Sequence, residues 1–592
     1  MYRCAQDHRF IAAMLVDRSS GAEAEAKAAL AQGHFKEFWL EAWACRDRMR
    51  LIAAGRVMCA GGRPTSDRMA RYIEALLAEG LHEEALEALA DGAAEEVLGA
   101  AAATLQARAL AGLGRFADAL AAAEQALERN PASERTRKLV KILRWTSALR
   151  NRVPGLSWAE WRPLLESCVL FAARASARRI LGDLAGAPAP PDSTARTATS
   201  DAATVLSIAA ELLDADSFSA LLDKADPVLA GDERIAAWRL EVSRRSGRAW
   251  SSAQEAISRG DPDLGSPALA CARAVTYDAA GETEAALNTF GRLGVEPARD
   301  VALFGEMART IGSEVISLAA PRYAPVGSRS RRVFNLIPFN NELELLEIRL
   351  QEMADWVDGF VIVESGQSFT GEAKPRVFEQ NRDRFRRFAS KIHYVGLDKF
   401  PAFANSAWAR NCFQRDMAIA GASGLWSPAD WVLISDADEI VDRSVLRRFN
   451  GVLASLMMTR YKFFFNYGAG PGNLRKLNDR CGVLCRAELL VEFGASYLRF
   501  CLSRQDKDWN YIPEAGWHFT SVGHAAGIAA KFRAHAHQGE GTAALRQEAD
   551  VAQMLDAIRA GRVEPGWMRY ELDERFPRAL RDRRQALEDM IL

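Results

Sequence analysis

Residues 1–320 place apolar side chains at helical spacing and contain few strand signals. A glycine followed by a short helical pattern recurs there at intervals of about 34 residues, from Gly80 to Gly114 and from Gly247 to Gly281. Glycine at such a position ends one helix and lets the chain turn into the next. The spacing predicts that residues 1–320 form an all-α solenoid of helical hairpins, with an alanine-rich helical bundle as the alternative.

Small residues and a proline recur at the places that paired helices need. Ala85 and Ala119 keep the same spacing as the glycines, and Ala126 and Pro131 follow in the second copy. Alanine lets two helices approach closely, and proline stops a helix before the next repeat. The period and these positions resemble the tetratricopeptide repeat family, which implies that the helical repeats bind a protein partner. A proline-rich stretch within 183–202 predicts a break in the repeat region.

Beyond residue 333 the pattern changes to short apolar runs that alternate with amphipathic segments. A stretch rich in proline, glycine, serine and arginine predicts a linker over 321–332. Strands are expected at 333–339, 356–363, 391–397 and 431–435, and helices at 343–353, 381–390 and 408–420. This alternation predicts βαβ units in a mostly parallel sheet. We therefore expect an α/β domain over 333–540, followed by a charged helical extension over 541–592.

The strand expected at 431–435 runs directly into the acidic residues Asp436, Asp438 and Glu439. In open α/β sheets, ligands bind outside the carboxyl ends of the strands. Three acids within four residues repel one another unless a cation neutralises them, and oxygen ligands suit Mg²⁺ or Mn²⁺ shared with substrate phosphates. The pattern therefore predicts a metal-bound diphosphate at Asp436 and Asp438, with a solvated acidic turn as the alternative.

Other polar residues are expected near the same edge. Asn341, Glu342 and Glu364 also follow predicted strands, so a doubly wound sheet would bring them to the same side as Asp436. Four of the eight histidines fall within 518–537. Histidine binds metals and titrates near neutral pH, so this cluster predicts part of a functional site, with structural side chains as the alternative.

Composition narrows the classes of protein. The 592 residues carry a formal net charge of −1, which argues against a dedicated nucleic-acid binder, and the length predicts two to four domains. No apolar run approaches the length of a transmembrane helix, and the amino-terminal stretch lacks the pattern of a signal peptide. The nine cysteines are scattered and odd in number. We expect reduced thiols in a cytoplasmic protein, whose membrane association, if any, is peripheral at the inner face.

Several motifs of the carboxy-terminal half, taken in order, resemble glycosyltransferase family 17. They are the segments 338–343, 360–365, 435–440, 516–519 and 535–537, together spanning about 333–540. The family includes a β-1,4-mannosyl-glycoprotein 4-β-N-acetylglucosaminyltransferase. The resemblance implies an inverting transferase of GT-A fold that uses Mn²⁺ or Mg²⁺. It would move a sugar from a UDP-sugar donor to a glycan or glycoconjugate acceptor, and N-acetylglucosamine is the first candidate for that sugar.

The same resemblance implies roles for individual residues. The expected metal ligands are Asp436, Asp438 and His518. The residues expected to contact the nucleotide-sugar are Asn341, Glu342, Glu364, Lys374, Arg410, Arg415 and Asp436. Inversion needs a carboxylate that takes the acceptor proton; the expected base is Glu514, with Asp508 and Asp506 as alternatives. The residues expected at the acceptor or behind the metal are Trp517, His524, Lys531, His535 and His537.

Two other functions remain open on the sequence. An apolar strand followed by Asp-x-Asp also occurs in haloacid-dehalogenase-type phosphatases, in which Asp436 would be the nucleophile. The chain could also be a non-catalytic repeat scaffold with a degenerate transferase domain. The segments 466–473 and 521–524 depart from the family pattern where an acceptor should bind. The resemblance therefore leaves the donor sugar and the acceptor undecided.

Overall fold

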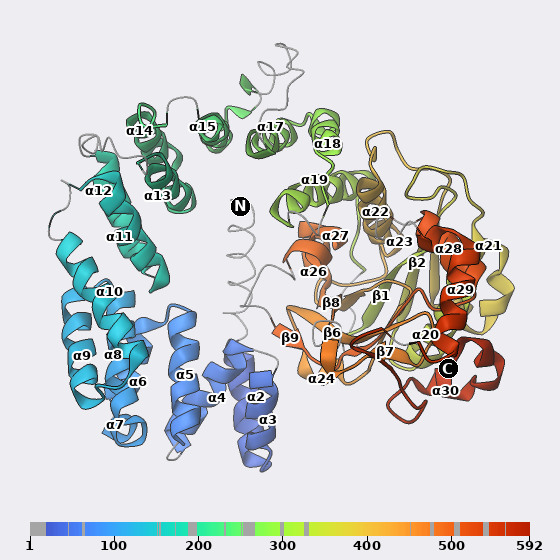
Figure 1. Ribbon diagram of the computed structural model, residues 1–592, viewed down its shortest axis with the longest axis horizontal. Coiled ribbons are helices and arrows are strands. Elements are labelled where there is room, and N and C mark those ends of the chain that lie inside the picture. Colours follow the sequence, from blue (N-terminus) through green and yellow to red (C-terminus); the bar gives the residue numbers. More distant parts are fainter. Residues whose placement is uncertain are drawn as a thin grey trace. The chain divides into compact units, whose positions relative to one another are not determined.

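The computed structural model describes the chain from residue 19 to residue 592 with gaps (Figure 1). The segments outside the description are 1–18, 45–46, 62–64, 91, 151, 153–155, 172, 187–197, 230–231, 250, 253–266, 297–300, 325–330, 450, 474–478, 503–509, 535, 537–543 and 563. The chain divides into two compact units. The first ends at Glu282, and the second runs from Thr283 to Leu592.

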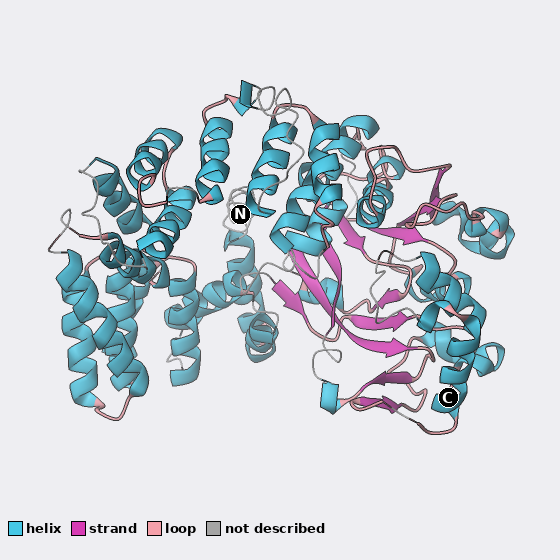
Figure 2. Cartoon of the chain, turned by 45° about the horizontal axis from the view of Figure 1, so that its top comes forward, coloured by secondary structure: helices cyan, strands magenta, loops and turns pink. Residues whose placement is uncertain are grey.

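The described residues of the first unit form helices joined by turns, without a strand, as Figure 2 shows by colour. Its helices are α2 (Ser19–Ala31), α3 (Phe35–Ala44), α4 (Arg48–Gly61), α5 (Ser66–Ala78), α6 (His82–Ala90), α7 (Gly92–Leu98), α8 (Ala100–Gly112), α9 (Phe116–Arg129), α10 (Glu134–Arg150), α11 (Trp158–Leu170), α12 (Arg174–Gly186), α13 (Ala198–Leu212), α14 (Ala215–Ala225), α15 (Glu233–Arg245) and α17 (Pro267–Ala279). Helices that follow one another pack together, as α8 does with α9.

The glycines of the repeated spacing do end helices. All four have positive φ, at 74° for Gly80, 73° for Gly114, 72° for Gly247 and 82° for Gly281, a conformation that glycine adopts without strain. Helices α5 and α6 pack together at Gly80, and α8 and α9 at Gly114, so the predicted hairpins are confirmed at these two glycines. The assignment to the tetratricopeptide family stays a prediction. The expected break at 183–202 falls mostly outside the described residues.

Buried alanines and tryptophans hold the first unit together. Ala85 and Ala119 are 0% exposed and Ala126 is 1% exposed, so the predicted close helix contacts are present. One apolar core is formed by α2 to α8, and a second contains the fully buried Trp158 and Trp161. These cores stabilise the hairpins because a short helix alone has too little buried surface to be stable.

The second unit contains a mixed sheet. Its strands are β1 (Val333–Phe339), β2 (Gly359–Ser365), β3 (Ile392–Leu397), β4 (Trp431–Ile434), β5 (Glu439–Val441), β6 (Leu453–Lys462), β7 (Tyr467–Ala469), β8 (Asp479–Arg486), β9 (Asn510–Ile512), β10 (Gly516–Thr520) and β11 (Trp567–Arg569). The main order is β11-β7-β6-β8-β4-β1-β2-β3, in which β4, β1, β2 and β3 are parallel. Strand β8 is antiparallel to both β4 and β6. The expected parallel strands are confirmed, but the sheet as a whole is mixed.

Helices of the second unit cover this sheet. They are α18 (Thr283–Arg292), α19 (Val301–Ala319), α20 (Leu343–Met353), α21 (Val377–Gln380), α22 (Ala407–Asp416), α23 (Ala418–Gly421), α24 (Val445–Arg448), α26 (Ala487–Phe493), α27 (Ala495–Tyr497), α28 (Ala525–Ala534), α29 (Glu548–Arg559) and α30 (Arg578–Asp582). The helix expected at 381–390 is a 3₁₀-helix, η1 (Arg382–Lys391), and residues 498–502 form a π-helix. Among the described helices of the chain, none is long and apolar enough to cross a membrane.

Two helices of the predicted repeat region belong to the second unit. Helix α19 packs against α22 and α27, and α18 packs against α19 (Figure 1). Phe304 of α19 is fully buried with its ring edge-on to those of Trp408 and Phe500, at centroid distances of 5.5 Å. The carboxy-terminal extension contributes helix α29 and also strand β11, which pairs with β7. Both ends of this unit therefore complete the fold of the sheet domain.

Candidate functional site

A cavity of about 680 Å³ lies in the second unit where β1 and β4 end. Its volume falls within the range of about 300–1,000 Å³ that is usual for small-molecule sites. The charged residues that line it are Glu296, Glu342, Lys374, Arg415, Asp436, Asp438, Glu439, Arg460, Lys462, Asp479, Arg480, Arg499 and Lys531, with His518 among them. Acidic and basic side chains are thus interleaved, as a site for an anionic ligand and a cation requires.

A buried arginine holds the loop that follows β4. Arg349, on α20, is fully buried and donates hydrogen bonds of 2.9 and 2.8 Å to the side-chain oxygen of Asn335 on β1. It also donates to the backbone oxygens of Asp436 at 2.5 Å and Glu439 at 2.6 Å. Burial lowers the pKa of Arg349 to about 10. Because the guanidinium binds backbone carbonyls as well as a side chain, it fixes the path of the acidic loop.

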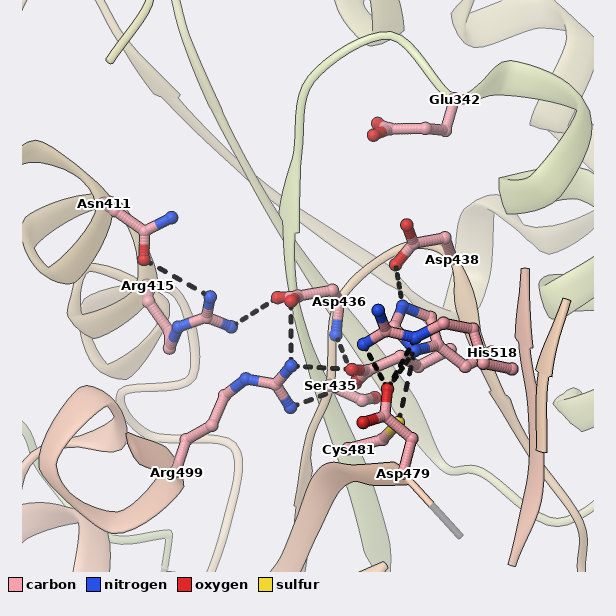
Figure 3. A network of polar contacts seen from close by, with 12 residues as sticks. Glu342, Asn411, Arg415, Ser435, Asp436, Asp438, Asp479, Cys481, Arg499 and His518 are labelled. Carbon is pink, nitrogen blue, oxygen red and sulfur yellow. Dashed lines mark hydrogen bonds and ion pairs between the residues drawn. The ribbon is translucent and has the colours of Figure 1, made fainter. Parts of the chain in front are cut away.

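Asp436 lies between two arginines (Figure 3). Its Oδ1 accepts a hydrogen bond of 2.6 Å from Arg415, and its Oδ2 accepts one of 2.8 Å from Arg499. The arginine side chains are 1% and 4% exposed, whereas that of Asp436 is 34% exposed and so faces the cavity. Desolvation opposes ionisation of Asp436, but the two positive charges outweigh it and lower the pKa of the carboxyl. The protein itself therefore compensates the charge of Asp436.

Asp438 contacts a lysine and a histidine instead of arginines. Its Oδ2 accepts a hydrogen bond of 2.7 Å from Lys531 on α28, and its Oδ1 lies 3.9 Å from Nε2 of His518. Lys531 also lies 3.2 Å from Glu342. Burial raises the pKa of the Asp438 carboxyl, but the charge of Lys531 outweighs burial and lowers it. Asp438 and His518 thus present an oxygen and a nitrogen to the same space.

The other ring nitrogen of His518 points to a second carboxylate. Nδ1 of His518 lies 3.3 Å from Oδ2 of Asp479 and 3.4 Å from the sulfur of Cys481 (Figure 3). Asp479 in turn accepts hydrogen bonds from Arg460, one of them at 2.7 Å. His518 therefore connects the acidic loop after β4 with strand β8.

Two sets of donor atoms near His518 could hold a divalent cation. Potential ligand atoms of Glu439, Cys481 and His518 lie within 4.8 Å of one another. However, both carboxylate oxygens of Glu439 accept hydrogen bonds from Arg499, and burial raises the pKa of the Cys481 thiol, which disfavours the thiolate that binds metals. Asp438 and His518 are the better pair, since a hard carboxylate and an imidazole suit Mn²⁺.

The structure brings many of the predicted residues to this cavity. Those that line it are Glu342, Lys374, Arg415, Asp436, Asp438, His518 and Lys531. Asn341 does not line it, although its neighbour Asn340 does. Lys374 lies at its edge, with Nζ 3.5 Å from the backbone oxygen of Asn340, and burial lowers the pKa of this amine.

Other predicted residues do not line the cavity and instead form hydrogen bonds within the protein. Glu364 is fully buried and accepts hydrogen bonds from the backbone of Phe378 at 2.9 Å and from the Tyr394 hydroxyl at 3.1 Å, so it holds the start of α21 rather than lining the cavity. Arg410 donates to the backbone oxygen of Phe369 at 2.8 Å, also outside the lining. The indole of Trp517 donates to the backbone oxygen of Arg575 at 2.8 Å.

The expected catalytic base is not among the lining residues. Glu514 is exposed, with φ of 49°, in the turn before β10. His524 is exposed at the start of α28. Four predicted residues lie outside the described part of the chain: Asp506, Asp508, His535 and His537. The assignment of the base stays a prediction.

Sequence reasoning assigned no role to three residues of this site. Arg349 and Arg499 hold the acidic loop, and Asp479 lies against His518. One signal was available for the arginines: each stands among apolar residues in the sequence, where a charged side chain needs a buried partner. Asp479 carried no comparable signal.

Comparison with known proteins covers the part of the chain that contains Asp436 and Asp438. Residues 323–476 match the model of glycosyltransferase family 17, so the predicted resemblance is confirmed for that segment. Two curated relatives are the β-1,4-mannosyl-glycoprotein 4-β-N-acetylglucosaminyltransferases of Rattus norvegicus and Homo sapiens. Each is 36% identical over 129 residues, which are 21% of this chain and 23% of the relative. The chain thus matches less than a quarter of the length of these relatives.

Proposed function

We propose that this chain, whose residues 323–476 match glycosyltransferase family 17, is an inverting glycosyltransferase that moves a sugar from a UDP-sugar to a glycan acceptor. The relatives' name supports N-acetylglucosamine as the sugar. The observation that carries the proposal is the cavity at the ends of β1 and β4, which is lined by Asp438, His518 and several lysine and arginine side chains. The cytoplasmic location and the identity of the acceptor stay predictions.

The basic residues of the cavity support binding of a diphosphate. Arg415, Lys374 and Lys531 line it, and the guanidinium of Arg415 has planar geometry that matches phosphate oxygens. Its buried position is stabilised by the ring of Phe500, whose centroid lies 5.0 Å from the guanidinium carbon. We place the donor diphosphate between Arg415 and Lys531. Asp436 then keeps Arg415 oriented rather than acting as a base.

We further propose that Mn²⁺ or Mg²⁺ is held by Asp438 and His518. When bound, such a cation would neutralise charge on the departing diphosphate. Lys531 already neutralises Asp438 at 2.7 Å and can form an additional hydrogen bond to a phosphate, because an ammonium has three donors. The protein thus supplies both charge compensation and a positioned lysine at the leaving group.

The amino-terminal helical unit is proposed to bind a protein partner or to position the acceptor. Its helical hairpins support this role, since stacked hairpins present extended binding surfaces.

The geometry of the described residues does not favour the phosphatase alternative. Asp436 would have to be the nucleophile, yet each of its carboxylate oxygens accepts a hydrogen bond from a buried arginine.

The test is UDP release from a panel of UDP-sugars with Mn²⁺, and UDP binding by calorimetry. Asp438→Asn should lower UDP release at least tenfold. Asp398→Asn, whose side chain is 89% exposed, should leave it unchanged. Binding of UDP without turnover of any UDP-sugar, even with glycan acceptors present, would support the non-catalytic scaffold instead. Failure of the native chain to bind UDP with or without Mn²⁺ would overturn the transferase proposal.

A further inference from the structure

We infer that Asp479 is a positioning residue that fixes the tautomer of His518 so that Nε2 faces a cation on Asp438. This inference rests on the proposed function, because it concerns the cation placed there. Asp479 lies beyond the segment 323–476 that matches the family, so the match says nothing of its role. The observation behind it is that the two nitrogens of His518 face two different carboxylates (Figure 3).

The ring of His518 is held from both sides. Strand β10 pairs with β5 and β6, so His518 stands opposite Glu439 on one side and Arg460 on the other. Its side chain is 12% exposed. Strand pairing on both sides and burial leave the ring little freedom. A contact on one nitrogen therefore decides which way the other nitrogen is presented.

Hydrogen-bond chemistry assigns the proton. A neutral imidazole has one donor nitrogen and one acceptor nitrogen, whereas an ionised carboxylate only accepts. Asp479 is paired with Arg460, which favours its ionised form, and it lies 3.3 Å from Nδ1. Asp479 therefore accepts Nδ1–H. Nε2 is left with its lone pair toward Asp438, a tautomer that can bind metal.

The opposite side of the ring then has room for a metal ligand pair. With the proton on Nδ1, Nε2 and Oδ1 of Asp438 are two acceptors that face each other at 3.9 Å. Each can lie about 2.1 Å from one small divalent ion, which would satisfy both. Nitrogen ligation also favours Mn²⁺ over Mg²⁺, because Mg²⁺ strongly prefers oxygen. The inference thus includes a preference for Mn²⁺.

A competing arrangement would use the other nitrogen. His518, Cys481 and Glu439 also offer ligand atoms within 4.8 Å of one another, and Nδ1 is the ring nitrogen that lies 3.4 Å from the sulfur of Cys481. In that arrangement Cys481 would be essential and the proton would lie on Nε2. The two arrangements therefore predict opposite tautomers and opposite effects of replacing Cys481.

The first experiment reads the tautomer directly in the full chain without metal. Proton–nitrogen NMR of ¹⁵N-histidine-labelled protein at pH 8, with the His518 signal identified by its loss in His518→Gln, should show the Nδ1–H form. Oδ2 of Asp479 contacts both Arg460 and Nδ1 of His518. Asp479→Leu conserves side-chain size and removes this shared acceptor, so the signal should change toward the Nε2–H form. A native chain in the Nε2–H form would overturn the inference.

The second experiment follows free Mn²⁺ by its electron paramagnetic resonance signal. Asp479→Leu should weaken Mn²⁺ binding 10–100-fold, the usual effect of losing a partner behind a metal ligand. Cys481→Ala is the control and should change the Mn²⁺ affinity less than threefold. Unchanged affinity in Asp479→Leu, loss in Cys481→Ala, or no Mn²⁺ binding by the native chain would each overturn the inference. Normal Mn²⁺ binding without UDP-sugar turnover would instead contradict the transferase proposal, but it would not contradict the role inferred for Asp479.

Discussion

Arg499 donates hydrogen bonds of 2.7 and 3.0 Å to the two carboxylate oxygens of Glu439. Both side chains are nearly inaccessible, at 4% and 2% exposure, and Arg499 also reaches Asp436 at 2.8 Å. The acids after β4 therefore have separate roles. Glu439 and Asp436 are neutralised by buried arginines, and Asp438 is the acid that faces Lys531 and His518.

Replacing Arg499 by Met should destabilise the second unit. The change leaves the buried carboxylate of Glu439 without its cation, and breaking a buried pair in this way costs about 3–5 kcal/mol of unfolding free energy. Urea denaturation measures the loss. The control is Arg578→Met, whose side chain is 63% exposed and 3.7 Å from Asp355; it should cost under about 1 kcal/mol. A similar small cost for both variants would contradict the buried ion pair.

Phe304→Ala should weaken both stability and UDP binding. Phe304 is fully buried against Phe500, the ring that contacts Arg415, and removing such a ring costs about 3–5 kcal/mol. We expect UDP affinity to fall severalfold, measured calorimetrically at a temperature where the variant is folded. Leu318→Ala, on the same helix but 62% exposed, is the control. Unchanged UDP affinity in folded Phe304→Ala would show that α19 does not support the site.

Asp416 should make stability depend on pH. It is fully buried, its Oδ1 accepts the Ser496 N–H at 2.8 Å, and burial raises the pKa of the carboxyl to about 7. The unfolded value is about 3.9. The folded chain thus holds this proton more tightly, so its stabilising effect is complete below about pH 4 and is lost as pH rises through about 7.

The corresponding measurement compares Asp416→Asn with the native chain by urea denaturation between pH 5 and 7. The native chain should lose up to about 1.4 kcal/mol more per pH unit than the variant. Asp398→Asn, at an exposed position, should keep the native slope. Parallel slopes for the native chain and Asp416→Asn would mean that Asp416 ionises normally in the fold.

Gly55→Ala should destabilise the first unit. A Cβ at this buried helical position would lie 2.1 Å from a ring carbon of Tyr72, which is itself only 3% exposed. Such overpacking costs about 1–3 kcal/mol. Gly182→Ala is the matched control, because its Cβ would meet no atom within 4 Å and alanine favours a helix by about 1 kcal/mol. Thermal unfolding should show a lower melting temperature for Gly55→Ala than for the native chain, and an equal or higher one for Gly182→Ala.

Local sequence patterns predicted the parts of the fold that local forces determine. Strand β1 and helix α20 have the expected bounds, because their apolar spacing and turn signals are contained in short windows. The antiparallel position of β8 between β4 and β6 was not expected. It depends on pairing between distant segments, which no short window records.

In the candidate site, too, residues recognisable from short motifs were predicted, whereas contacts between distant segments were not. Asp436, Asp438, His518 and Lys531 were predicted and do line one cavity. Glu364 was expected just after a strand but is part of β2, and the segment that starts α21 covers it, which the sequence pattern did not reveal. The pairing of Arg499 with Glu439 joins residues 60 positions apart and is set by packing.

The place of α18 and α19 bears on how such a protein could have been assembled from modules. The family match begins at residue 323, but α19 buries Phe304 in the sheet unit, and Asn405 donates to Asn288 of α18 at 2.8 Å. A gene segment cut at residue 323 would encode a sheet domain with an uncovered apolar face, prone to aggregate. Recombination that exchanged this domain between proteins would have to carry both helices, so the boundary of the exchanged segment lies upstream of residue 283.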